Sequence, residues 1–109
     1  MSALVKFALA SVLVIGTAFC GVSAAQAMDY TIVVDEMKFG LAPAELHVGD
    51  TIIWQNKDIF RHSATARDKS FDVDLPSRTE VRMVVGTTGT VEFFCKFHPG
   101  MKGTLVISP

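Results

Sequence analysis

Short runs in which apolar and polar residues alternate recur along residues 28–109. They are rich in Val, Ile, Thr and Phe and are separated by Gly, Asp, Asn and Pro, and no stretch repeats apolar residues at helical spacing. The pattern predicts strands at residues 30–35, 45–48, 51–55, 71–73, 80–85, 90–95 and 103–108. About seven short strands predict an all-β fold, a Greek-key two-sheet β-sandwich, because a single sheet would leave one apolar face uncovered.

Alternation within these strands predicts which side chains face the core. Over residues 90–95, Val91, Phe93 and Cys95 share one side, so Cys95 is expected to point inward at the end of its strand. Met83 alternates with Val81 in the same way and is predicted to pack in the core.

The strands over residues 45–48 and 51–55 are joined by Gly-Asp, a turn-forming dipeptide. Alternation predicts that Leu46 and Val48 face the core together with Trp54, which leaves His47 on the outer face. The next segment, residues 56–70, carries many charged residues around His62 and is predicted to be mostly loop.

The first 27 residues differ from the rest of the chain. Lys6 precedes an almost wholly apolar run over residues 7–19, and small residues close the segment at 25–27. This order is typical of a secretory signal peptide. A transmembrane anchor is the alternative, but the run is shorter than the roughly 20 residues that span a bilayer. We expect residues 1–27 to be cleaved, residues 28–109 to form a single periplasmic domain, and no stable membrane insertion of that domain.

Composition and cysteine count narrow the class of protein. A chain of 109 residues, 50% of them hydrophobic, supports one modest core, and a net charge of −1 argues against a nucleic-acid partner. Cys20 follows the bulky Phe19, which disfavours lipidation at a lipoprotein cleavage site. Loss of the signal leaves Cys95 unpaired in a compartment where cysteines normally pair, so it is either an inert buried residue or a functional thiol.

The segment from Cys95 to Met101 brings a thiol, an imidazole and a thioether together at Cys-x2-His-x2-Met spacing. A tight turn at Pro-Gly, residues 99–100, directs Cys95, His98 and Met101 toward one point. Thiolate and imidazole with a weak axial thioether are typical of a blue copper site, which needs a second imidazole. His62, in the predicted loop, is the best candidate, since His47 is expected to point outward.

Two other chemistries use similar residues. Zinc also binds Cys and His, but it prefers four strong ligands, a thioether is a poor one, and the segment over residues 95–101 has no carboxylate. A catalytic Cys-His pair would make Cys95 a nucleophile and His98 its base. The sequence shows no evident residue to orient the base and no oxyanion hole, so we expect a protein that is not an enzyme.

The segment over residues 44–56, AELHVGDTIIWQN, is followed by a histidine and later by the Cys-x2-His-x2-Met loop. In both motifs and their order, the chain resembles the cupredoxin (type 1 blue copper) family, and within it the amicyanin-like and plastocyanin-like proteins, over most of residues 30–108. The resemblance implies a cupredoxin-like fold and one type 1 copper per chain. The ligands that it implies are His62, Cys95 and His98 in the equatorial plane and Met101 on the axis.

Two positions depart from the family pattern. Many members have Asn directly after the first ligand histidine, where its side chain helps to hold the ligand loop, and here the residue is Ser63. Amicyanin-like sequences have Pro before that histidine, and here Arg61 is expected to place a cation near the entrance of the site.

The resemblance implies an exported monomer that cycles between Cu(I) and Cu(II) and transfers electrons between redox partner proteins. The exposed edge of His98 is the expected port. The candidates for an apolar patch around it are Leu41, Phe60, Phe97 and Pro99, and core or turn packing is the alternative for each of them. A copper-binding or copper-delivery module that uses the same ligands without transferring electrons is the alternative function.

Overall fold

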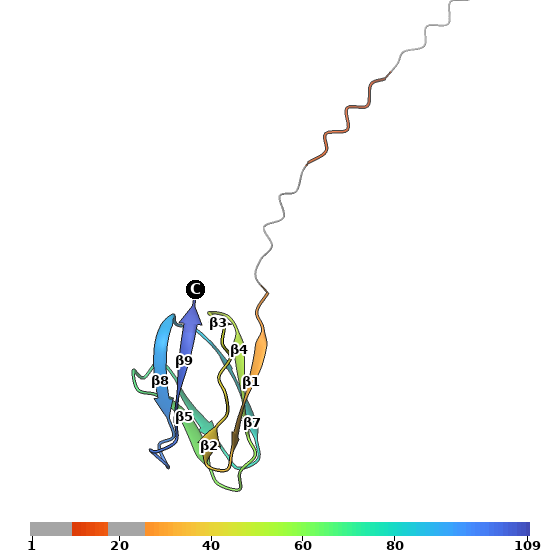
Figure 1. The fold of residues 1–109 in the computed structure, drawn as a ribbon. Helices are drawn as coiled ribbons and strands as arrows, with labels where there is room; N and C mark the ends of the chain where they lie inside the picture. The colour runs from red at the N-terminus through yellow and green to blue at the C-terminus, as the bar shows by residue number, and fades with distance from the viewer. Residues whose placement is uncertain (1–9, 18–25) are drawn as a thin grey trace, which may run out of the picture.

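The computed structural model describes residues 10–17 and 26–109 (Figure 1). In this part the chain forms nine strands and no helix: β1 Asp29–Asp35, β2 Lys38–Phe39, β3 Leu46–His47, β4 Thr51–Asn56, β5 His62–Ala66, β6 Asp72–Leu75, β7 Glu80–Val84, β8 Gly89–Phe94 and β9 Lys102–Ser108. Residues 1–9 and 18–25 of the expected signal peptide, Cys20 included, lie outside the described residues. Among the residues described, no helix has the length and apolar character needed to cross a membrane.

The strands form two sheets that face each other, as Figure 1 shows. One sheet has the order β2-β1-β4-β7 and the other the order β3-β9-β8-β5-β6. The pairs β1/β4 and β3/β9 are parallel, whereas the remaining pairs are antiparallel. The predicted all-β sandwich is therefore confirmed, and each predicted strand overlaps an observed one.

The core lies between the two sheets and is centred on aromatic rings. Trp54 of β4 and Phe93 of β8 are almost completely buried, with ring centroids 5.3 Å apart in an edge-to-face arrangement. Phe39 packs edge-on against Phe93, with ring centroids 4.9 Å apart. Such contacts add to the hydrophobic effect of removing large rings from water. The predicted core position of Met83 is also confirmed, because this half-buried side chain packs against the cluster.

Alternation was a wrong guide at one position. Leu46 is buried as predicted, but Val48 is 42% exposed. The strand β3 ends at His47 and the chain turns at Gly49, which has a φ of 95°. Because Val48 lies between the strand and the turn, the two-residue period no longer applies to it.

Strand β5 corrects the prediction of a loop over residues 56–70. This strand pairs with β6 on one side and β8 on the other, and His62, expected in a loop, is its first residue. Four of its five residues are buried. Since the residues that follow His62 in this strand are Ser, Ala, Thr and Ala, the strand shows neither the apolar alternation nor the large β-branched residues that identify strands in a sequence. The short β2 was also missed, and it follows a turn in which Glu36 and Met37 have φ values of 50° and 60°.

The packing of Phe93 predicts the effect of a single added methyl group. A Cβ atom built on Gly103, the residue paired with Phe93, would overlap with the Cζ atom of that ring. The ring has no room to retreat from its aromatic neighbours, so Gly103→Ala should lower the free energy of unfolding by about 1–3 kcal/mol in urea titrations. Gly86→Ala, where the new Cβ meets nothing within 4 Å, is the control and should change it by less than about 0.5 kcal/mol. Equal stability of the two variants would contradict this packing.

Candidate metal centre

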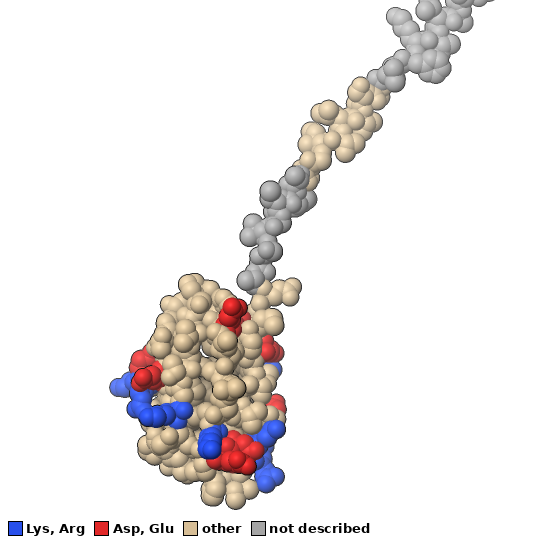
Figure 2. Space-filling model, viewed as in Figure 1, with Lys and Arg blue, Asp and Glu red and all other residues tan. Residues whose placement is uncertain are grey.

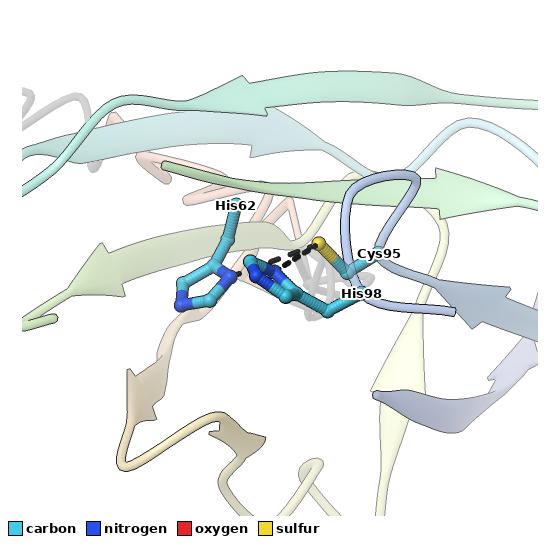
Figure 3. A group of neighbouring side chains, drawn as sticks. All are labelled: His62, Cys95 and His98. Carbon is cyan, nitrogen blue, oxygen red and sulfur yellow. Dashed lines mark hydrogen bonds between the residues drawn. The ribbon is translucent and has the colours of Figure 1, made fainter. Parts of the chain in front are cut away.

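The side chain of His62 meets those of Cys95 and His98, which are distant from it in sequence, at one end of the sandwich (Figure 3). His62 begins β5, Cys95 follows β8, and His98 lies in the loop that leads to β9. Their ligand atoms all lie within 4.8 Å of one another. The Cys95 Sγ atom is 3.7 Å from Nδ1 of His62 and 3.8 Å from Nδ1 of His98. The structure thus brings together three of the four predicted ligand residues around one point.

The separations of these atoms suit a shared metal ion. Bonds of about 2.0–2.1 Å to nitrogen and 2.3 Å to sulfur, arranged in a trigonal plane, place the two atoms roughly 3.7–3.8 Å apart. His62 and Cys95 are fully buried, whereas His98 is partly exposed. In the described residues this is the only group of three or more His, Cys, Asp or Glu side chains that could hold a metal ion. It contains no carboxylate, so its donor atoms fit copper better than zinc. The three side chains are positioned to bind one copper ion.

Met101 closes the loop that carries Cys95 and His98. Its N–H donates to the His98 carbonyl at 2.9 Å, and its own carbonyl accepts from the Cys95 N–H at 3.0 Å. The residue is 6% exposed. These backbone bonds fold the loop back on itself, as the Pro-Gly turn predicted. The buried Met101 thus follows Cys95 and His98 in the same folded loop.

Asp58 orients the imidazole of His62. Its Oδ2 atom lies 2.7 Å from Nε2 of His62, and the same carboxylate accepts the N–H groups of Glu36 and Met37 in the turn before β2. Burial opposes its charged form, but these hydrogen bonds outweigh that effect and hold the pKa of Asp58 below its ordinary value of 3.8. An ionised carboxylate only accepts, so Nε2 of His62 is the donor in this contact, and Nδ1 is the ring nitrogen that faces the sulfur of Cys95.

A buried amide holds the loop that positions Asp58. The Asn56 side-chain NH₂ donates to the Phe60 and Leu75 carbonyls at 2.9 and 3.0 Å, and its Oδ1 accepts the Asp58 N–H at 2.9 Å. Asn56 is 1% exposed. Because it ends β4, it connects the central strand of one sheet to the segment just before His62. The role of Asp58 was missed from the sequence, where it was one of several charged residues in a predicted loop.

Ser63 connects β5 to the ligand loop. Its backbone N–H donates to Cys95 Sγ at 3.4 Å, and its hydroxyl oxygen accepts the Lys96 N–H at 2.9 Å. The residue is fully buried. A serine therefore still forms a hydrogen bond to the ligand loop at the position where the family pattern has asparagine.

The hydroxyl of Ser63 belongs to a closed circle of hydrogen bonds. Thr65 donates its single hydroxyl proton to Asp72 Oδ1 at 2.9 Å, so Ser63 is the donor in its 2.9 Å contact with Thr65. The Lys96 ammonium donates to the other oxygen of Asp72 at 3.0 Å, and the Lys96 backbone N–H donates to Ser63. Lys96, with the Thr65 bond as the further contribution, holds the pKa of Asp72 below its ordinary value. Aligned donors of this kind strengthen one another.

The comparisons with known proteins agree with this site. The family model of the cupredoxin-like domain matches residues 6–107. The chain belongs to the cupredoxin-like family. This cupredoxin is 29% identical over 93 residues to the amicyanin of Paracoccus denitrificans, a match that covers 78% of the chain and 71% of that protein.

Solved structures show the same fold. The crystal structure of amicyanin from Paracoccus versutus gives a TM-score of 0.61 at 20% identity, covering 78% of this cupredoxin and 84% of that chain. A copper-containing nitrite reductase from Thermus scotoductus gives a TM-score of 0.63 at 23% identity. That match covers 82% of this chain but only 24% of the reductase chain, so it extends to one part of that enzyme.

The surface beside His98 combines apolar side chains with one cation. Phe60 and Phe97 are 51% and 46% exposed, and the Phe60 ring lies 6.2 Å from the ring of His98. The Arg61 guanidinium lies 4.7 Å from the centre of the Phe97 ring, and its Nε donates to Asp74 at 2.8 Å. This contact with Arg61 lowers the pKa of Asp74. The expected cation is therefore present, but its charge is paired within the molecule.

The remaining predictions about single residues have clear outcomes. His47 lies on the surface, with 49% of its side chain exposed, which confirms the predicted outward position. Leu41 is 95% exposed, and Pro99 is also exposed. The place of these two residues in an apolar patch around His98 stays a prediction.

Removal of the Ser63 hydroxyl should weaken the connection between β5 and the ligand loop. Ser63→Ala leaves the Lys96 N–H without its acceptor, so the free energy of unfolding should fall by about 1–3 kcal/mol and the Lys96 amide should exchange its hydrogen faster. Urea titration and amide exchange measured by NMR test this. Ser108→Ala, at an exposed position of β9, is the matched control and should change neither quantity appreciably. Unchanged exchange of the Lys96 amide in Ser63→Ala would refute the connection.

Proposed function

We propose that this protein is an exported blue copper electron carrier, with one copper ion held by His62, Cys95 and His98 and, more weakly, by Met101. The observation that carries the proposal is the meeting of the three His and Cys ligand atoms within 4.8 Å in a chain of the cupredoxin-like family. Met101 is the remaining donor of the loop, and a thioether is the usual weak axial ligand of such a site. Copper supplies a one-electron couple between Cu(I) and Cu(II).

The contribution of the chain is to keep the ligand atoms in place in both oxidation states of the copper. Asp58 fixes the ring of His62, the N–H of Ser63 fixes the sulfur of Cys95, and backbone bonds fix the loop that bears His98. Two of these three ligand side chains are fully buried. A site whose ligands move little on gain or loss of an electron exchanges electrons rapidly.

His98 is the proposed port for electrons. It is the only one of the three His and Cys side chains that is partly exposed, and the exposed rings of Phe60 and Phe97 lie on its side of the molecule. Small apolar surfaces suit short-lived redox interfaces. Lys and Arg lie beside Asp and Glu on the face shown in Figure 2, while the end of the domain at the bottom of that view is mostly uncharged. We therefore propose apolar contact, rather than a strong charge field, as the basis of docking to donor and acceptor proteins.

We further propose that the mature protein begins after residue 27, acts in the periplasm as a monomer, and is not an enzyme. The apolar residues 12–15 support removal of the leader, because they are 75–82% exposed and pack against no core.

The visible spectrum tests the copper site. The protein loaded with Cu(II) should show the intense visible absorption of a blue copper protein, and Cys95→Ser should abolish it because the thiolate is lost. A coloured Cys95→Ser variant would refute the site.

Met101→Gln should keep copper bound with a lowered reduction potential, measured by voltammetry, because only the weak axial ligand changes. A blue protein without reversible electron exchange would favour copper handling over electron transfer.

Copper affinity tests the contribution of Asp58. Asp58→Ala releases the ring of His62, so affinity for copper, measured by competition with a chelator, should fall about 10- to 100-fold. Asp68→Ala removes an exposed loop carboxylate that accepts hydrogen bonds from Ser70 and should leave the affinity unchanged. Equal affinity of the two variants would show that Asp58 does not orient the ligand.

A further inference from the structure

We propose that a peptidase cuts the bond between Ala27 and Met28, and that the new α-ammonium group of Met28 then pairs with the buried carboxylate of Asp50. The site lies at the start of β4, whereas the other end of this strand, at Asn56, bonds the segment before His62. Processing of the precursor would in this way strengthen the end of the sandwich that is remote from the metal centre.

Met28 is already held in the position that the pair requires. Its backbone nitrogen donates to Asp50 Oδ1 at 2.9 Å, and its carbonyl accepts the Thr51 N–H at 2.9 Å. The strand β1 begins at the next residue, Asp29, which pairs with Thr51. The peptide bond between Ala27 and Met28 therefore lies just before the first residue that is hydrogen-bonded into the sandwich.

Asp50 is a buried carboxylate with few positive partners. It is 3% exposed and accepts two backbone N–H groups, those of Met28 and of His47, at 2.9 and 2.8 Å. These two bonds hold the pKa of Asp50 below its ordinary value of 3.8. The nearby His47 Nδ1, 3.8 Å from Asp50 Oδ2, is a cation only when protonated. A buried carboxylate without a full positive charge beside it pays a desolvation penalty.

Hydrolysis changes the charge of the Met28 nitrogen without moving it. Water adds across the amide: its oxygen remains on the Ala27 carbonyl carbon, which becomes a carboxylate, and the Met28 nitrogen takes up protons and becomes an ammonium group. The 2.9 Å contact, which before the cut joins a neutral N–H group to the ionised carboxylate of Asp50, then joins two opposite charges, and their attraction adds to the hydrogen bond.

The sequence before the cut suits the peptidase. Residues 25–27 have the small-x-small pattern of a signal cleavage site, and Gln26 and Ala27 are exposed. Other charged groups border the same open hollow and must be counted in any titration. The titratable residues that line the hollow are Tyr30, Glu45, His47 and Asp50.

The ammonium group gives the proposal a measurable signature. A free α-amino group has a pKa of about 7.7–8.0, and a carboxylate in contact raises it. The stabilisation is complete below the ordinary value and is lost as the pH rises through the raised one. At low pH it also falls when Asp50 takes up a proton, and a protonated His47 competes for the same carboxylate.

The test uses the full chain, exported and processed by the host. Mass spectrometry of the purified protein should show Met28 as the first residue, and a different first residue would overturn the proposal. In protein labelled with ¹³C-methionine, the Cα shift of Met28 should then report the pKa of the amine. We expect it to lie above 8.0 in the folded protein, with a proton affinity about tenfold or more above that of the same chain in urea. Equal values in the two states would overturn the pairing.

Two variants locate the partner of the amine. Asp50→Asn should return its pKa to the ordinary range, while Glu45→Gln, which removes an exposed carboxylate of the same hollow, should leave it raised. The opposite result would assign the pair to Glu45 and overturn the proposal. If Asp50→Asn does not fold, the comparison of the folded and urea-unfolded parent protein still decides whether a pair exists.

Discussion

The hydrogen bonds of Ser63 hold together the two parts of the chain that carry the metal ligands. His62 comes from β5, and Cys95 and His98 come from the loop after β8, so one buried residue between them sets their separation. Its N–H contacts the sulfur and its hydroxyl accepts from the ligand loop. The circle that continues through Asp72 satisfies the hydroxyl completely, which matters because a buried polar group without a partner is costly.

Strand β4 connects the metal centre to the opposite end of the sandwich. Each of its ends has a buried polar side chain: Asp50 comes just before the strand, and Asn56 is its last residue. Asp50 gathers the N–H groups that precede β1 and close β3, while Asn56 gathers the carbonyls around the segment before His62. Between them Trp54 fills the core. The hydrogen bonds at its two ends thus fix the position of β4 relative to the start of the domain and to the segment before His62.

The strands that the sequence revealed are those with large side chains on one face. In β8 the alternation of Val91 and Phe93 is visible because one side meets the core and the other meets water. Strand β5 has small residues and neighbours on both sides, so its pattern resembles that of a polar loop. The turn at Gly49 ended the alternation before Val48, and such an end depends on backbone dihedral angles that a pattern of apolar residues does not record.

Local spacing alone determined that Cys95, His98 and Met101 belong to one turn, because residues six positions apart or fewer in a tight loop stay close together in space. The unpaired cysteine and the two motifs also determined the family. Only the tertiary structure decided that His62 meets Cys95 and His98 and that Asp58, Ser63, Thr65 and Asp72 support the site. The physical reason is that a hydrogen bond needs its two atoms within about 3 Å, and the packing of two sheets, not nearness in sequence, brings such atoms together.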